Sequence, residues 1–95
     1  MITSMCYFGT NICNNENVTK KEWDIFVNQN IVSELESFTI SDNTGYYKGK
    51  LEITYILTII HDNSQEIYNK LNKIKNKYIE LYNQEEVMIT NIETT

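Results

Sequence analysis

The chain has 95 residues, of which 41% are hydrophobic and 22% charged, and its net charge is −5 with a pI of about 4.7. A chain of this length forms one small domain that buries about 60–65% of its unfolded surface, so a shared interface would add stability. The acidic balance and the absence of arginine oppose binding to DNA or RNA, because no guanidinium group is present to grip phosphates.

No apolar run is long enough to span a membrane, and the first residues do not resemble a secretory leader. We therefore expect a cytoplasmic protein that binds no membrane. Cys6 and Cys13 are seven residues apart, which fits neither a redox pair nor a zinc site, so we expect free thiols. With one histidine, three glycines and no nucleotide-loop motif, the sequence predicts neither a metal nor a cofactor.

The first half of the chain predicts one strand and one helix. Residues 5–10 are aromatic and contain a glycine, as is typical of a short strand that leads into the asparagine-rich loop of residues 11–17. Thr19 as N-cap, with Glu22 three residues later, forms a capping box and predicts a helix that begins there. Apolar residues then recur at helical spacing until the helix ends near residues 30–33: Trp23, Phe26, Val27 and Ile31.

The second half predicts three strands and one long helix. Alternation favours a strand over residues 37–42, and Asp42-Asn43-Thr44-Gly45 has the composition of a turn. Residues 51–60 form the strongest strand pattern, and residues 65–82 carry an apolar stripe at helical spacing. The last strand is expected over residues 86–92, so the folded core extends from about residue 5 to residue 92 of a single domain, 1–95.

The element order β-α-β-β-α-β predicts a ferredoxin-like α+β fold, in which two helices cover one face of a four-stranded antiparallel sheet. The strand of residues 51–60 carries apolar side chains on both of its faces, since Ile56 and Ile60 alternate with Tyr55, Leu57 and Ile59. Packing between the sheets of two copies would cover the second face and leave a cavity between them. We therefore expect a homo-oligomer that forms through the sheet face.

Several landmarks together resemble an uncharacterised bacterial family known as domain of unknown function 3574. They are Tyr7-Phe8-Gly9, Glu22-Trp23 followed by Phe26, and the segment of residues 78–87. The resemblance extends from about residue 6 to residue 90 and includes Glu52 and Gln84, which recur in the family pattern. It implies a shared fold, but it implies no activity because none is assigned to the family.

Seven tyrosines, three phenylalanines and one tryptophan are more than the core of so small a domain requires. Tyrosine suits stacking on a planar ligand, and the hairpin segment of residues 46–50 joins two tyrosines to two lysines. The simpler interpretation of this segment is an edge hairpin whose lysines oppose aggregation. The candidate ligand-binding residues are Tyr7, Tyr46, Tyr47, Lys48, Lys50, Glu52 and Gln84.

Three functions fit these patterns. The first is a non-enzymatic oligomeric module that binds or sequesters a small, nucleotide-like molecule; the isoleucine- and asparagine-rich composition fits a phage or mobile-element origin. The second is a small enzyme of the dimeric α+β barrel type that uses a tyrosine or His61 for proton transfer, although a lone histidine beside helix-capping residues is a weak catalytic candidate. The third is a protein-interaction domain.

Overall fold

The computed structural model of the chain describes residues 1–12 and 16–94. Four longer strands form one sheet, and two helices pack against it. A separate pair of strands, each of two residues, follows the first strand. The elements are β1 (Ile2–Gly9), β2 (Asn11–Ile12), β3 (Glu16–Asn17), α1 (Lys20–Phe26) with its π-helical extension η2 (Val27–Ile31), β4 (Thr39–Tyr47), β5 (Lys50–His61), α2 (Gln65–Tyr82) and β6 (Met88–Glu93).

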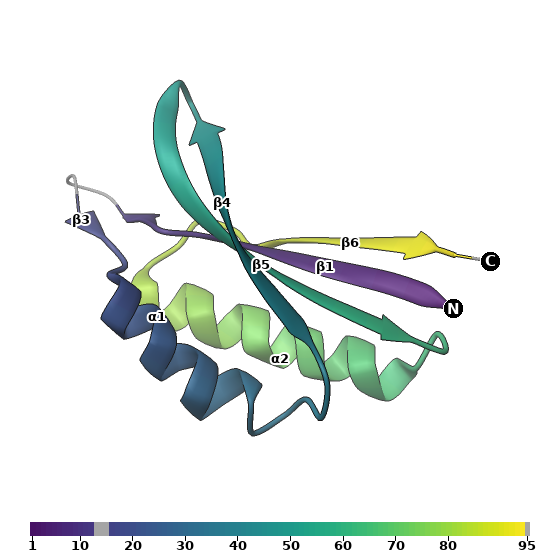
Figure 1. Cartoon of the computed structure of the whole chain (residues 1–95). Helices are drawn as coiled ribbons and strands as arrows, with labels where there is room; N and C mark the ends of the chain where they lie inside the picture. The colour runs from purple at the N-terminus through teal and green to yellow at the C-terminus, as the bar shows by residue number, and fades with distance from the viewer. Residues whose placement is uncertain (13–15, 95) are drawn as a thin grey trace.

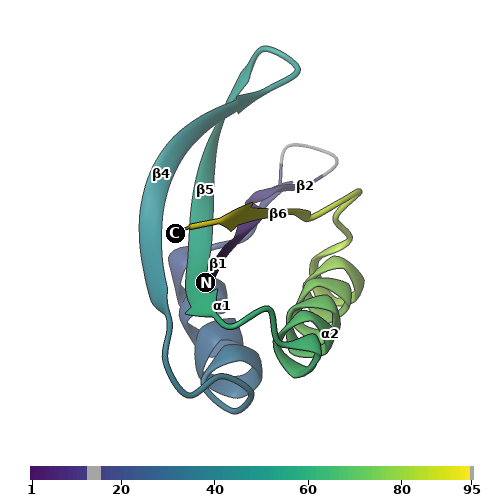
Figure 2. The same ribbon diagram turned by 90° about the vertical axis from the view of Figure 1, so that its right-hand side faces the viewer.

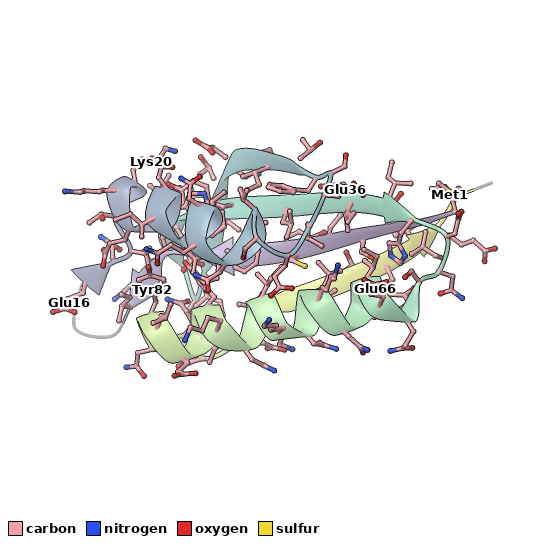
Figure 3. The ribbon with its side chains drawn as sticks, turned by 90° about the horizontal axis from the view of Figure 1, so that it is seen from below. Met1, Glu16, Lys20, Glu36, Glu66 and Tyr82 are labelled. Atoms are coloured by element: carbon pink, nitrogen blue, oxygen red, sulfur yellow. The ribbon has the colours of Figure 1, made fainter. Side chains whose placement is uncertain are left out.

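The main sheet has the strand order β4-β5-β1-β6, and every neighbouring pair in it is antiparallel. Both helices lie on the same side of this sheet, as Figure 1 and the perpendicular view in Figure 2 show. The arrangement is the predicted ferredoxin-like fold, so the expected α+β class is confirmed. Seen from below, α1 and α2 lie next to each other beneath the strands (Figure 3).

The core lies between the helices and alternate residues of the two central strands. Tyr55, Leu57 and Ile59 of β5 are buried there, while the residues between them face the other way. Aromatic rings fill the middle: Trp23 stacks on Tyr55 with ring centroids 4.4 Å apart. The rings of Phe8 and Tyr78 meet edge to face at 5.0 Å. Two of the seven tyrosines are therefore core residues, which frees the others for the surface.

The two helices begin where their capping residues predict. The Thr19 side chain accepts a hydrogen bond from the backbone N–H of Glu22, and the Glu22 carboxylate accepts one in return from the backbone N–H of Thr19. Ser64 caps the second helix, because its side chain accepts a hydrogen bond from the backbone N–H of Ile67. Asn83 ends α2 in the left-handed conformation. The predicted bounds of α2, residues 65–82, are confirmed.

The predicted turn at Asp42-Asn43-Thr44-Gly45 is wrong. These residues lie within β4, which continues to Tyr47, and the chain reverses at Lys48 and Gly49. Both turn residues have positive φ, 51° and 77°, and a two-residue hairpin with this geometry matches the twist of the strands on either side. Gly45 is needed for space rather than for a turn, as the geometry of the cleft shows below.

Two other boundaries differ from the predictions. β1 begins at Ile2 rather than at residue 5, because the start of the chain pairs with both β5 and β6. Part of the expected loop after it forms the ribbon of β2 and β3. Cys6 is buried, and this burial raises the pKa of its thiol to about 12, so the thiol is unreactive at neutral pH. Cys13 lies outside the described residues.

The face of the sheet away from the helices is uncovered within the chain, and we call it the open face. On β1, β6 and the inner part of β5 it consists of Thr3, Met5, Tyr7, Ile56, Thr58, Ile60, Met88, Thr90 and Ile92. It continues on β4 with Thr39 and Ser41 and on the outer part of β5 with Thr54 and Glu52. The outer part of the β4–β5 hairpin, residues 44–53, extends beyond the other strands and curls away from the helix layer (Figures 1 and 2). We call this part the arm. In the described residues, no helix is long and apolar enough to cross a membrane.

Candidate functional site

A cleft of about 600 Å³ lies where the arm leaves the sheet. Its walls come from three regions that are distant in sequence: the arm, the end of β1, and the segment between α2 and β6. Figure 1 shows these regions toward the same end of the molecule, away from the chain termini. The volume is within the range of sites that bind small molecules.

Two glycines open the floor of this cleft around Glu52. Gly45 lies directly opposite Glu52 in the β4–β5 pairing and offers no side chain to fill the space. On the other side, the Glu52 carboxylate lies so close to Gly9 that a Cβ there would be 2.7 Å from Oε2. Glycine at position 9 therefore lets the Glu52 side chain lie against the sheet within the cleft. A Cβ at residue 45 would instead be 3.0 Å from Oγ1 of Thr54, so Gly45 leaves room for that side chain.

The Glu52 carboxylate is held by the segment that follows β1. The backbone N–H of Asn11 donates to Oε2 at 2.9 Å. That segment is fixed in turn by two residues of the C-terminal half: the Tyr78 hydroxyl donates to the Gly9 carbonyl at 2.6 Å, and the Gln84 amide donates to the Asn11 carbonyl at 3.1 Å. The backbone of residues 9–11 thus connects the packed core to the cleft, and this connection fixes the position of the Glu52 carboxylate.

The tip of the arm is tied to the segment after α2. The Tyr47 hydroxyl donates to the Glu85 carboxylate at 3.0 Å, and the ammonium of Lys48 lies 5.2 Å from the centre of the Tyr47 ring. Both contacts are exposed to solvent, so each contributes little to stability. The bond between Tyr47 and Glu85 affects shape, because it keeps the tip of the arm next to the segment after α2, whereas the contact of Lys48 with Tyr47 lies within the arm.

The charged residues of the cleft differ in their exposure to water. Glu52 is half-buried, while Lys48, Lys50, Glu85 and Glu86 are exposed. Within residues 1–12 and 16–94, no hydrogen bond reaches Oε1 of Glu52 and no ion pair involves its carboxylate. A half-buried charge acts through a lower effective dielectric constant than exposed charges do. Glu52 therefore dominates the electrostatics inside the cleft.

All seven candidate residues from the sequence line this one cleft: Tyr7, Tyr46, Tyr47, Lys48, Lys50, Glu52 and Gln84. They differ in placement. Tyr7 and Glu52 lie on the sheet, whereas Tyr46 is at the rim with 75% of its surface exposed. Gln84 fixes the wall by its bond to Asn11. The structure thus brings the residues together, and their binding of a ligand stays a prediction.

His61 does not belong to the cleft. It is at the far end of β5, where it pairs with Ile2, and only 7% of its surface is exposed. The backbone N–H of Ser64 donates to Nδ1, so the proton of the neutral ring is on Nε2, which donates to the Ser4 hydroxyl at 2.9 Å. The Ser4 hydroxyl in turn donates to Oδ1 of Asn91 at 2.5 Å. With both ring nitrogens engaged, the histidine joins the end of the sheet to the start of α2.

Some residues of the cleft were not predicted from the sequence. Asn11 supplies the hydrogen bond to Glu52, Glu85 anchors the arm, and Met88 adds an apolar side chain that is 58% exposed. No motif marks these residues, because each acts through a backbone group or through a position fixed by the tertiary fold. Gly9 was marked in the sequence, because it is the last residue of the family landmark Tyr7-Phe8-Gly9.

Tyr78 connects the core to this site, because its ring is fully buried while its hydroxyl donates to the Gly9 carbonyl. Burial raises the pKa of its phenol above the ordinary value of 10, and the nearby Tyr82 and Glu52 raise it further. The phenol therefore stays protonated and keeps donating to Gly9 throughout the neutral range.

In the residues that the structure describes, no cluster of three or more metal-ligating side chains occurs.

Residues 3–95 match the model of a family described as "Protein of unknown function (DUF3574)". The chain belongs to this family. The resemblance inferred from the sequence landmarks is thus confirmed, and it extends over nearly the whole chain. No functionally curated protein matches the sequence.

Solved structures with a similar fold include a phage SAM lyase, in complex with S-methyl-5'-thioadenosine and in the apo state. The complex is 16% identical with a TM-score of 0.66, and 97% of this chain aligns with 80% of that chain. The apo state is 20% identical with a TM-score of 0.67, over 97% and 79% of the two chains. A de novo designed protein, Foldit4, is 13% identical with a TM-score of 0.62, over 99% and 98%. At these identities the likeness shows the fold alone.

Proposed function

We propose that this protein binds a nucleoside-like small molecule in the cleft. The observation that carries the proposal is the cleft itself: about 600 Å³ of space on the open side of the sheet, with Tyr7 and Tyr47 offering aromatic surfaces and Glu52 and Gln84 offering polar groups. A planar ring stacks favourably on tyrosine, and a few fixed polar groups orient a ligand within an otherwise apolar site.

The fold comparison supports the same ligand class. A phage SAM lyase of similar fold was solved in complex with S-methyl-5'-thioadenosine, which has a planar base, a ribose and a thioether. We take this molecule as the probe for the cleft, because its size and flat base suit a site of this volume.

Calorimetric titration with S-methyl-5'-thioadenosine tests the proposal. We expect saturable binding to the wild-type chain and a loss of about tenfold in affinity for Tyr47→Ala, because removal of one stacking ring costs on the order of 1–3 kcal/mol. Tyr68→Ala is the matched control, since Tyr68 is near the other end of α2 and packs on His61. Absence of binding to the wild-type chain, or equal losses in the two variants, would contradict the proposal.

A catalytic role is the second candidate, favoured by the fixed, half-buried Glu52 carboxylate in the cleft. A carboxylate in such a position can accept a proton from a bound substrate. The two candidates separate when the protein is incubated with S-adenosylmethionine: a binding module returns the compound unchanged, whereas an enzyme consumes it. His61 is not a candidate for the proton transfer in this cleft, because it is at the other end of β5.

We propose further that a second copy of the chain covers the open face. The nine residues of this face on β1, β6 and the inner part of β5 include no charged side chain, although 22% of the whole chain is charged; Glu52 lies on the same side but within the cleft. In a symmetric dimer, a charged residue near the two-fold axis faces the same residue of the other chain and is repelled by it. An apolar face without charges therefore suits self-association. Ile60, Met88 and Ile92 each expose more than half of their surface there. Light scattering at high micromolar concentration would then give a mass above the 11.2 kDa of one chain.

A further inference from the structure

We infer that the cleft selects a positively charged ligand, with the carboxylate of Glu52 as the counter-ion of an ammonium or sulfonium group. This inference rests on the proposed function, because it concerns which nucleoside-like molecules the cleft accepts. It gives the main role to Glu52, whereas the sequence drew attention to Lys48 and Lys50 of the hairpin.

The position of Glu52 carries the first step. Its carboxylate lies within the cleft, fixed at Oε2 by the Asn11 N–H, while Oε1 receives no hydrogen bond from the described residues. One oxygen is therefore oriented by the protein, and the other is free to contact a ligand. A carboxylate oxygen without a donor accepts cations and N–H groups and repels phosphate.

The balance of the other charges carries the second step. The lysines of the cleft, Lys48 and Lys50, are exposed at the tip of the arm, and Lys48 lies over the Tyr47 ring. Exposed lysines are strongly hydrated and screened by salt, so they offset little of a half-buried negative charge. Glu85 and Glu86 are exposed as well, so they too change the field inside the cleft little, and Glu52 remains its main charge.

The aromatic lining carries the third step. Tyr7 and Tyr47 line the same cleft as Glu52, so a ligand that fills this space can contact both the carboxylate and the face of a tyrosine ring. Cations are attracted to the face of an aromatic ring, whereas phosphate gains nothing there. A nucleoside with a cationic substituent therefore satisfies both the aromatic and the acidic parts of the cleft.

The matched probes are S-adenosylmethionine and S-adenosylhomocysteine, which differ by one methyl group and one positive charge at sulfur. We expect calorimetry on the wild-type protein to give up to about fivefold tighter binding of the sulfonium compound, the preference that one partly screened ion pair provides. Adenosine 5'-monophosphate, which has the same base with a phosphate, should bind more weakly than either.

Glu52→Gln is the decisive variant, because glutamine still accepts the Asn11 N–H through its carbonyl oxygen but has no charge. It should bind both probes with nearly equal affinity. Glu80→Gln makes the same change in net charge on an exposed part of α2 outside the cleft, and it should keep the preference. Circular dichroism of both variants checks that they fold.

The outcomes separate the inference from the function on which it rests. If no adenosine compound binds to the wild-type chain, the proposed function fails. If the probes bind but the sulfonium compound has no advantage, or if Glu52→Gln keeps the advantage, the charge inference alone is overturned. A preference that is lost in Glu52→Gln and kept in Glu80→Gln supports it.

Discussion

Gly9 lacks a side chain at the point where the Glu52 carboxylate needs the space. A Cβ at residue 9 would be 2.7 Å from Oε2, but the atom it meets is the flexible end of a side chain rather than backbone. We therefore expect Gly9→Ala to change the free energy of unfolding by less than about 1 kcal/mol while displacing the carboxylate. Calorimetry should show weaker binding of S-adenosylmethionine, by about as much as in Glu52→Gln.

A double-mutant cycle checks the cause of this loss. If Gly9→Ala acts through the carboxylate, then adding it to Glu52→Gln should weaken binding little further, because the interaction is already gone. Fully additive losses, or wild-type affinity in Gly9→Ala, would show that residue 9 does not act through Glu52.

Two buried acids make the fold sensitive to alkali. Burial raises the pKa of the Cys6 thiol from 9.0 to about 12 and raises the pKa of the Tyr78 phenol above 10. The unfolded chain ionises first, so the stabilisation is complete below about pH 9 and is lost as the pH rises toward the folded-state values. We expect the free energy of unfolding, measured with urea, to fall by up to about 1.4 kcal/mol per pH unit for each ionising group.

Tyr78→Phe separates the two contributions. It removes the phenol that donates to the Gly9 carbonyl, so it should cost about 1 kcal/mol at neutral pH. It should also make the decline above about pH 10 less steep, because one buried group fewer ionises. A free energy of unfolding that is the same at neutral and alkaline pH would contradict this account.

At the scale of the elements, the arm is the part of the fold that shapes the cleft. Tyr47→Phe removes the hydrogen bond between its tip and Glu85, which is exposed. We expect the free energy of unfolding to change by no more than about 0.5 kcal/mol, as is usual for surface substitutions. Hydrogen exchange should become faster in the arm, residues 44–53, because its outer end loses its tether.

Tyr46→Phe is the matched control for the arm. Tyr46 is the neighbouring tyrosine, 75% exposed, and none of the hydrogen bonds among the described residues involves its hydroxyl. It should exchange like the wild-type protein. If the two variants behave alike, the bond between Tyr47 and Glu85 does not hold the arm in place.

The elements differ in how well their sequences predict them. The long helix has a cap, an apolar stripe and a left-handed end, and its bounds follow from these signals. The position of the hairpin turn does not follow from the sequence. Asp42-Asn43-Thr44-Gly45 has turn composition, whereas the actual turn at Lys48 and Gly49 contains only one residue that favours positive φ. Strand pairing along β5 overrides the local preference and moves the turn to the end of the longer hairpin.

At the scale of the whole molecule, the open face sets the expected assembly. Ile60→Glu places a charge on β5 within the open face. The Ile60 side chain is 60% exposed, so the monomer should still fold. Light scattering should give the mass of a single chain, because burying two like charges at a symmetric interface is costly. Leu81→Glu, at a 48% exposed position of α2, should leave the oligomer intact. A wild-type chain that is monomeric would contradict the proposed interface.

The cleft was only partly predictable. The sequence indicated its tyrosines, lysines, Glu52 and Gln84 by composition and by family resemblance, but it placed the expected cavity between two copies of the chain. The structure forms a cleft within one chain, because the long hairpin carries the arm away from the sheet. Distances such as that between Gly9 and Glu52 depend on the pairing of distant strands, which no local pattern encodes.

The most direct test of the central claim is a titration of the ¹⁵N-labelled protein with S-methyl-5'-thioadenosine, followed by two-dimensional NMR. The account predicts saturable shifts of the backbone amides of Gly9, Asn11, Gly45 and Glu52, with little change around His61. No saturable shift, or shifts that centre on the His61 end of the sheet, would contradict the claim that the cleft beside the arm binds the ligand.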